Sequence, residues 1–296
     1  MTTTALIAGV NKAGTTSLYV SLSEHPDVVP SALKETRYFL PARYGRPLEP
    51  ASVWEGYFPT ASDGGVRLEA TPSCFYGGAW VARAMCDVIA QPRVILVLRE
   101  PVARALSFFT YQKMRLRFPE DMPFEQYLAA ADRLHDADFD DPANEKYMAV
   151  RGGRYADWLP AWRDVVGEDH VHVMFFEHLL ADQAGQLRAL AEWLHLDPDR
   201  FPHETLRSEN LTTGYRNRRL QQLALAGNDR LELVLRRMPA VKRALRAAYF
   251  RLNGRLVSDE LSTAVRAELT ARFEEPNRRL AAQLRGAEVP LPPWLT

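Results

Sequence analysis

The sequence has few cysteines, no long apolar run and no net charge, and each absence excludes a class of protein. Its 296 residues include only two cysteines, Cys74 and Cys86, whose separation is not that of metal ligands. A secreted disulfide framework would need more. The 37 basic residues balance the 37 acidic residues, so the overall charge predicts neither a nucleic acid nor a membrane as partner. No stretch approaches the roughly 20 apolar residues of a membrane span.

The N-terminal residues also lack the features of a signal peptide. The apolar run ALIA, residues 5–8, is short and leads directly into a glycine-containing loop. We therefore expect a cytoplasmic protein. A length of 296 residues with 47% apolar side chains is enough for one large α/β domain with a sizeable core.

Short apolar runs alternate with helical patterns along the chain. Strands are expected at Thr4–Ala8, Val28–Val29, Val66–Ala70, Arg93–Leu98 and His170–Phe175. Helices are expected at Thr15–Ser23, from Thr71 onward, at Val102–Arg115 after the first-turn proline Pro101, at Tyr155–Trp162 and at Gln186–Leu194. The run RVILVL, residues 93–98, is typical of the centre of a parallel sheet. The alternation predicts one domain over residues 1–296, an α/β, P-loop-like three-layer sandwich with a central parallel sheet flanked by helices.

Two segments depart from this alternation. A helical basic segment at about 217–256 is expected as an insertion near the C-terminus. Within residues 229–256, leucines recur at helical spacing among arginines. Pro239 should kink this helix. We interpret it as an amphipathic pair with a solvated face, the alternative being a peripheral contact with a lipid headgroup or an anionic acceptor. The acidic stretch 132–145 is interpreted as solvated surface, with a flap over an acceptor as the alternative.

The sequence GVNKAGTTSL, residues 9–18, looks like a phosphate-binding loop without its usual lysine. Gly9 and Gly14 have the spacing of G-x-x-x-x-G-K-[ST], but Thr15 stands at the lysine position and Lys12 lies inside the loop. Such a turn between a strand and a helix directs backbone N–H groups at an anion, and hydroxyl groups and a lysine add donors. The residues expected to hold the anion are Lys12, Ala13, Gly14, Thr15, Thr16 and Ser17.

The strand RVILVL is followed by Arg99, where triphosphate enzymes place an acid that holds Mg²⁺. An arginine there repels a metal and attracts a second anion. Ser107, two helical turns farther along, can face the same ligand. These residues predict a ligand with two separated anionic groups and no metal. The nucleotide 3′-phosphoadenosine-5′-phosphosulfate (PAPS), the biological sulfuryl donor, fits, and its spent product is adenosine 3′,5′-bisphosphate (PAP).

Six blocks in order resemble the sulfotransferases that depend on this donor, nearest to the branch that includes the heparan sulfate sulfotransferase domains. The blocks are GVNKAGTTSLYVSLSEHPDVV, KETRYF, LEATPSCFY, RVILVLREPVARALSFF, GGRYADWLPAWRDVVGEDHVHVMFFEHLL, and RFEEPNRRL with the late Trp294. The family's glycine before the acid of the third block is Leu68 here, and the lysine after it in the heparan branch is Ala70. The resemblance therefore extends to donor binding rather than to heparan-like acceptor recognition.

The resemblance assigns roles to individual residues. Lys12 is expected to contact the phosphosulfate oxygens where negative charge grows as the S–O bond breaks. Glu35 matches the catalytic base, which takes the proton from an acceptor hydroxyl or amine as that atom attacks sulfur in line. Arg99 and Ser107 are expected on the 3′-phosphate. The stretch from Thr212 to Arg219 matches a later donor-binding loop loosely, with Gly214 and Arg216 as the expected contacts.

Several alternatives remain open. Glu69 is a second candidate base, or else fixes loop geometry; His25, near the donor loop, is expected to be structural. A P-loop kinase of a small molecule would need Mg²⁺ and a strand-end acid, and a non-catalytic nucleotide-binding protein would need no base. The acceptor is a small molecule such as a secondary metabolite, a peptide, a glycan or a lipid. No nucleic acid is expected, and the oligomeric state is not readable.

Overall fold

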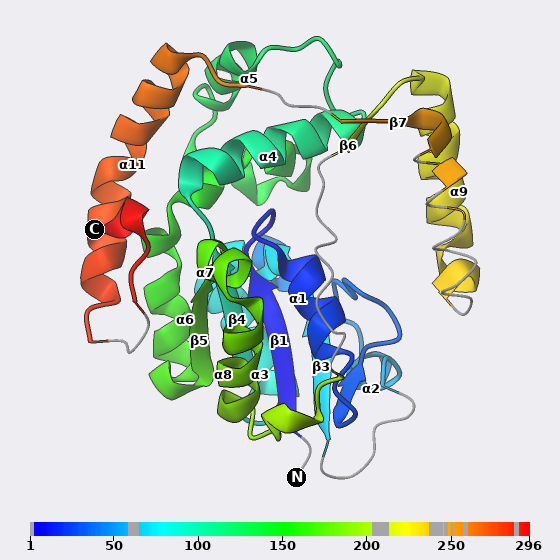
Figure 1. Ribbon diagram of the computed structural model, residues 1–296, viewed down its shortest axis with the longest axis vertical. Coiled ribbons are helices and arrows are strands. Elements are labelled where there is room, and N and C mark those ends of the chain that lie inside the picture. Colours follow the sequence, from blue (N-terminus) through cyan, green and yellow to red (C-terminus); the bar gives the residue numbers. More distant parts are fainter. Residues whose placement is uncertain are drawn as a thin grey trace.

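A five-stranded parallel sheet in the order β2-β3-β1-β4-β5 lies at the centre of the chain (Figure 1). The computed structural model describes residues 3–58, 65–202, 213–236, 245, 248–249, 251–256, 260–286 and 290–296. The strands are β1 (Thr3–Gly9), β2 (Val28–Pro30), β3 (Val66–Ala70), β4 (Arg93–Leu98) and β5 (Val171–Phe175). All five lie where the sequence predicts strands.

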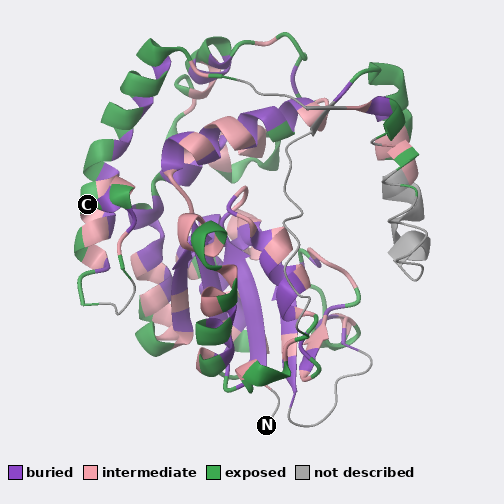
Figure 2. Cartoon of the chain, viewed as in Figure 1, coloured by how far each residue is buried: buried purple, intermediate pink, exposed green. Residues whose placement is uncertain are grey.

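Strand β4 runs between β1 and β5 because its sequence suits burial on both faces. Residues 94–98 are completely buried. Val94 lies opposite Leu6 of β1 on one side and Val171 of β5 on the other. A parallel strand covered by helices on both sides reads as a continuous apolar run, and Figure 2 shows the sheet as the buried centre of the molecule.

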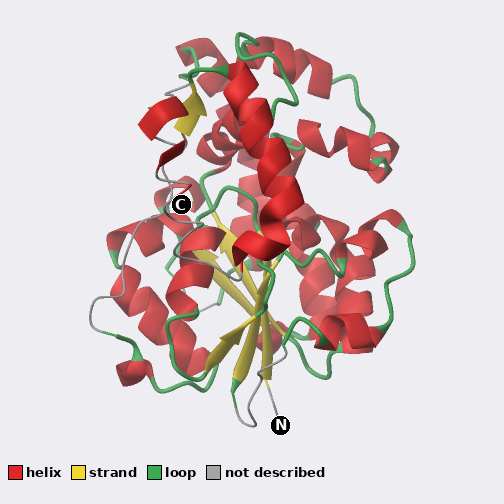
Figure 3. Ribbon diagram, turned by 90° about the vertical axis from the view of Figure 1, so that its right-hand side faces the viewer, coloured by secondary structure: helices red, strands yellow, loops and turns green. Residues whose placement is uncertain are grey.

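Helices cover both faces of the sheet (Figure 3). On one face α1 (Thr15–Leu22) and α8 (Gln183–Trp193) lie together, and Gln183 Nε2 donates to Ser21 Oγ at 3.2 Å. On the other face α3 (Gly78–Val88) packs against α6 (Leu159–Val166). The three-layer α/β prediction is confirmed.

Helix α4 (Pro101–Met114) crosses the carboxyl ends of the strands (Figure 1). It begins at Pro101 as predicted, because proline lacks the N–H that the first turn leaves unbonded. The Glu100 side chain caps it by accepting from Val102 N and Ala103 N, at 2.9 and 2.6 Å. In open α/β sheets ligands bind at the carboxyl ends of the strands, so α4 forms one wall of the region where a site is expected.

Two predicted helices differ from the observed ones. The chain from Pro72 first forms a 3₁₀ helix to Gly77, and α3 begins only at Gly78. The segment Tyr155–Trp162 is divided into a 3₁₀ turn at Tyr155–Asp157 and α6 from Leu159. Pro160 accounts for the second difference, because it fits a first helical turn and not a helix interior.

The remaining elements surround this body. They are α2 (Ala51–Glu55), α5 (Phe124–Ala131), α7 (Phe176–Ala181), α9 (Arg218–Arg236), α11 (Thr263–Gln283), the antiparallel pair β6 (Thr213–Tyr215) and β7 (Gly254–Leu256), and 3₁₀ turns at Leu40–Tyr44, Asp136–Asp140, Pro142–Tyr147, Arg151–Gly153, Glu168–His170, Pro198–Arg200 and Pro293–Leu295. Helix α9 covers the first half of the predicted basic segment, whereas Pro239 and its neighbours lie outside the described residues. Among the helices of the described ranges, none combines the length and the apolar character that crossing a membrane requires.

Candidate active site

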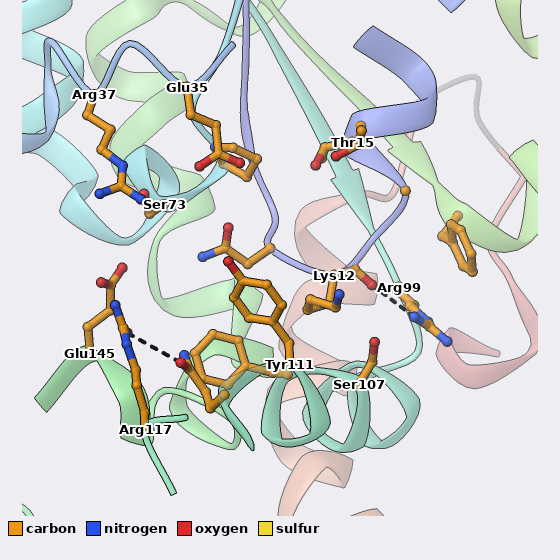
Figure 4. A pocket seen from close by; sticks show the side chains of 17 residues that line it. Lys12, Thr15, Glu35, Arg37, Ser73, Arg99, Ser107, Tyr111, Arg117 and Glu145 are labelled. Atoms are coloured by element: carbon orange, nitrogen blue, oxygen red, sulfur yellow. Dashed lines mark hydrogen bonds between the residues drawn. The ribbon is translucent and has the colours of Figure 1, made fainter. Parts of the chain in front are cut away.

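A cavity of about 340 Å³ lies between the loop after β1, the loop after β2 and helix α4 (Figure 4). It brings together residues that the sequence places far apart. The predicted site residues that line it are Lys12, Gly14, Thr15, Thr16, Glu35, Arg99 and Ser107. Lys12 and Glu35, the predicted catalytic pair, therefore share one cavity with the predicted 3′-phosphate contacts Arg99 and Ser107.

Four predicted donor contacts do not line this cavity. Ala13 is a fully buried residue of the loop after β1. Ser17 follows Thr16, the last residue of α1 that lines the cavity. Gly214 lies in β6, and Arg216 is exposed beside it, with its N–H bonded to the Asn253 carbonyl at 2.8 Å. Their roles toward the donor stay predictions.

Gly14 forms the junction between the loop and α1. Its φ of 79° is left-handed, and a Cβ at this position would lie 2.8 Å from Cδ2 of Phe176. No side chain caps α1, which begins at Thr15. The first N–H groups of a helix have no partner within it, so an uncapped N-terminus on a cavity wall is suited to an anion.

Lys12 is a largely buried cation at the cavity wall. Its Nζ lies 4.8 Å from the ring centroid of Tyr111, which projects from α4 (Figure 4). Burial, and to a smaller extent the charge of Arg99, lower the pKa of the ammonium group to about 8, and the charge of Glu35 opposes the change. A pKa perturbed by burial and by a second charge, at a cavity wall, is typical of residues that serve a ligand.

Arg99 extends from the end of β4 toward the same end of the cavity. Its Nη1 donates to the Lys12 carbonyl at 2.9 Å, and its guanidinium lies 4.6 Å from the Phe176 ring centroid. Burial lowers the pKa of Arg99 as well. Glu100, its neighbour in the chain, caps α4. Within the described ranges no carboxylate forms an ion pair with Arg99, so its charge is available to a ligand.

Glu35 reaches the cavity from the loop after β2. Its N–H donates to the Ala70 carbonyl at 3.1 Å, and its side chain is 41% exposed and within 3.3 Å of Lys34 Nζ. Glu35, Lys12 and Arg37 all have left-handed φ values, of 61°, 73° and 59°. Residues other than glycine rarely adopt this conformation, and when they do they cluster at active sites and ligand clamps.

Comparison with known proteins identifies a family that matches most of the chain. Residues 2–217 match the sulfotransferase domain family. This chain belongs to that family. Heparan sulfate glucosamine 3-O-sulfotransferase 6 of Mus musculus is 32% identical over 192 residues, which are 65% of this chain and 52% of that protein. The bifunctional heparan sulfate N-deacetylase/N-sulfotransferase 1 of Caenorhabditis briggsae is 25% identical over 207 residues, 68% of this chain and 23% of that protein.

The chain spans about half the length of the 3-O-sulfotransferase relative, or 52%. Over its full length it also resembles the crystal structure of a sulfotransferase from Alicyclobacillus acidocaldarius, with a TM-score of 0.69, 21% identity and complete coverage of both chains. At that identity the likeness establishes the fold. The family predicted from the six ordered blocks, and its nearness to the heparan sulfate branch, are confirmed.

The two other acid–base candidates of this sulfotransferase-family chain do not line the cavity. Glu69 is buried in β3 and accepts hydrogen bonds from Thr36 and Thr71. His25 is 1% exposed; its Nε2 lies 2.9 Å from the Asp197 carbonyl, and its Nδ1 accepts from Asp27 N at 3.1 Å. His25 therefore stabilises the turn after α1, as the sequence led us to expect.

The cavity also contains residues that the sequence did not single out. They are Asn11, Arg37, Pro72, Ser73, Phe108, Tyr111, Gln112, Arg117, Glu145 and Phe176. Tyr111 could have been found, since it follows Ser107 by four residues on one helix face. Arg37 follows Glu35 by two residues in the block KETRYF. Arg117 and Glu145 come from irregular segments whose placement no local pattern predicts.

Acidic residues of the stretch 132–145 pair with arginines elsewhere in the chain. Asp132 accepts two hydrogen bonds from Arg272 of α11, and Asp136 pairs with Arg151. Glu145 lies 3.6 Å from the buried Arg43. These contacts favour the interpretation as solvated surface over that as a flap. In the part of the chain that the structure describes, no cluster of His, Cys, Asp and Glu has the makings of a metal site; the metal-free reaction stays a prediction.

Proposed function

We propose that this chain transfers a sulfuryl group from PAPS to a hydroxyl or amine of an acceptor. The observation that carries the proposal is the arrangement of two partly buried cations, Lys12 and Arg99, at one end of a cavity that Glu35 also lines. Two cations, hydroxyl groups and an uncapped helix N-terminus suit a donor with two separated anionic groups. Gly14 fits as well, because any larger residue would move the loop that must approach the donor.

Each of these residues has a separate role in the transfer step. Glu35 takes the proton of the acceptor as the acceptor oxygen or nitrogen forms its bond to sulfur. The bond between sulfur and the bridging oxygen breaks at the same time, and its electron pair stays on the phosphate oxygen beside Lys12. Because charge on that oxygen grows during the step, Lys12 stabilises the transition state more than the bound donor. Arg99 and Ser107 hold the 3′-phosphate and set the donor's position.

We further propose that the acceptor carries an anionic group. Two exposed arginines, Arg37 and Arg117, line the end of the cavity away from Arg99 (Figure 4). Arg117 Nη1 donates to Gln112 Oε1 at 3.3 Å, and among the described residues no carboxylate pairs with either arginine. Glu145, the nearby acid, is already beside Arg43. Heparan sulfate, named for the relatives, is an anionic glycan, and an acidic small molecule or lipid would meet the same arginines.

Donor binding is the first test. Calorimetric titration with PAP should give tight binding without Mg²⁺, and ATP with Mg²⁺ should bind weakly. Lys12→Ala and Arg99→Ala should each weaken PAP binding by at least about tenfold, since each removes a charge-assisted contact. The matched control is Arg93→Ala at the opposite end of β4, which should bind normally. Preference for ATP with Mg²⁺ would identify a kinase instead.

Glu35→Gln separates an enzyme from a binding protein. The variant should keep PAP affinity and lose turnover by about 100-fold or more, because general base catalysis contributes about 10²–10⁴-fold. A wild-type chain that binds PAP but transfers no sulfuryl group to any acceptor class would favour the non-catalytic alternative.

The acceptor proposal is tested by paired substrates. Arg37→Gln and Arg117→Gln should raise the KM for heparan sulfate by about tenfold each, and much less for a form whose carboxylates are reduced and whose sulfates are removed, since a charged hydrogen bond is worth about 1.5–3 kcal/mol. Arg115→Gln, a neighbour outside the cavity lining, is the control. An equal effect on both substrates would contradict recognition of an anionic group.

We also retain three sequence-based proposals. Membrane contact through segment 229–256 can be tested by liposome binding of an alanine variant at Arg236, Arg237, Lys242 and Arg243, of which only Arg236 lies within the described residues. Location in the cytoplasm and a role in secondary metabolism are proposals of the same standing, which cell fractionation and metabolite profiling can test.

A further inference from the structure

The loop that carries Glu35 is held in an uncommon conformation. Glu35 and Arg37 both have left-handed φ values, and Thr36 between them is buried. A conformation of this kind persists only where surrounding contacts specify it. In this loop the contacts that specify the conformation centre on the side chain of Glu69.

Glu69 lies in β3, opposite Leu6 of the central strand β1, and is 2% exposed. Its Oε1 accepts three hydrogen bonds: from Thr36 N at 3.0 Å, from Thr36 Oγ1 at 3.1 Å and from Thr71 Oγ1 at 2.6 Å. Three donors converge on one oxygen, so the network depends on an oxygen acceptor at this position.

The two threonine hydroxyls extend this contact to the rest of the loop. Each has one hydrogen, which it donates to Glu69, so each accepts from a backbone N–H. Thr36 Oγ1 accepts from Tyr38 N at 3.3 Å, and Thr71 Oγ1 accepts from Arg37 N at 3.2 Å. One buried oxygen of Glu69 thus fixes the backbone at Thr36 directly, and at Arg37 and Tyr38 through a threonine hydroxyl. The N–H of Glu35 donates to the carbonyl of Ala70, the residue after Glu69.

We propose that Glu69 is a positioning residue for the reaction: through Thr36 and Thr71 it holds the backbone that directs Glu35 and Arg37 into the cavity. This inference rests on the proposed function. It differs from a role of Glu69 as the base, because Glu69 does not line the cavity. A base displaced by even 1 Å loses about 100-fold in rate, which makes such positioning effective.

The test compares two replacements of Glu69 by kinetics and calorimetry. Glu69→Gln retains an oxygen acceptor, so its kcat should stay within about threefold of the wild type. Glu69→Leu removes the acceptor, so its kcat should fall by about 10- to 100-fold while PAP affinity stays unchanged. Loss of kcat in Glu69→Gln equal to that in Glu35→Gln would overturn the proposal and make Glu69 the base. Normal kcat in Glu69→Leu would overturn it as well.

A second pair of variants keeps the test valid if Glu69→Leu does not fold. Thr36→Val and Thr71→Val preserve side-chain shape and remove one hydroxyl each, so each should lower kcat about tenfold with PAP affinity intact. The matched control is Thr4→Val, a buried threonine in β1 outside the network, which should keep full kcat. Normal kcat in both Thr36→Val and Thr71→Val would overturn the proposal. Failure of the proposed function looks different, since the wild-type chain would then neither bind PAP nor transfer a sulfuryl group.

Discussion

At the scale of single residues, Lys12 shows how its surroundings prepare a side chain for its proposed role. It is largely buried beside a second cation, and within the described ranges Glu35 is the group whose charge most raises its pKa. Its pKa of about 8 lies well below the ordinary value of 10.5. The ammonium group is therefore charged at neutral pH but is poorly solvated, which strengthens its attraction to an anion.

This pKa predicts the pH dependence of the free enzyme. The value of kcat/KM for the donor should fall as pH rises through about 8, because Lys12 then loses its proton and its charge. Lys12→Arg keeps a charge at all these pH values, so in this variant the decline should move to higher pH. Steady-state kinetics between pH 6 and 10 make the comparison. An identical decline in both proteins would assign it to another group.

At the scale of elements, the junction between β1 and α1 depends on a glycine for two separate reasons. Gly14 has a left-handed φ, and its missing Cβ leaves room for Phe176. Gly45 is also left-handed, with a φ of 62°, but a Cβ there meets nothing within 4 Å. The two glycines therefore separate the effect of backbone conformation from that of close contact.

Replacement by alanine should affect the two positions differently. Gly45→Ala should lower the free energy of unfolding by about 1 kcal/mol through backbone conformation alone and leave PAP binding unchanged. Gly14→Ala should lose PAP affinity by more than about tenfold, since the loop must move away from Phe176. Adding Phe176→Ala to Gly14→Ala should recover part of the affinity. Denaturant unfolding and calorimetry measure both effects, and equal behaviour of the two single variants would contradict the steric argument.

The elements that local sequence determines were also the ones it predicted. The run RVILVL gave β4, and Pro101 marked the start of α4, because burial pattern and proline geometry act within a few residues. Two of the three hydrogen bonds of Glu69 come from Thr36 and join the loop after β2 to β3, and sheet packing sets this pairing across 33 residues. Arg117 likewise reaches the cavity through the fold, so sequence spacing carried no signal for it.

At the scale of the whole molecule, the buried ionisable groups beside the cavity oppose folding. Burial lowers the pKa of Lys12 to about 8 and raises that of Glu69 from 4.5 to about 6. Hydrogen bonds from Thr71 and Thr36 limit the change at Glu69, and the charge of Glu35 adds to it. In both residues the folded state disfavours the charged form, so near pH 7 both charges reduce the free energy of unfolding.

Removing the two charges should therefore stabilise the protein. Between pH 4.5 and about 6 the folded state binds more protons at Glu69 than the unfolded state, so stability falls as pH rises. Between about 8 and 10.5 it binds fewer at Lys12, so stability rises with pH. The double variant Lys12→Met with Glu69→Gln should gain on the order of 2–5 kcal/mol at pH 7 and lose both slopes.

Urea unfolding of this double variant at pH 5, 7 and 9.5 measures the gain and the slopes. Glu55→Gln serves as the control, because its side chain is 55% exposed and a surface change of this kind stays within about 0.5 kcal/mol. A double variant less stable than the wild type at pH 7 would mean that the fold stabilises these charges. A more stable variant without turnover would mean that the charge of Lys12 is maintained for the reaction, because folding alone would select against it.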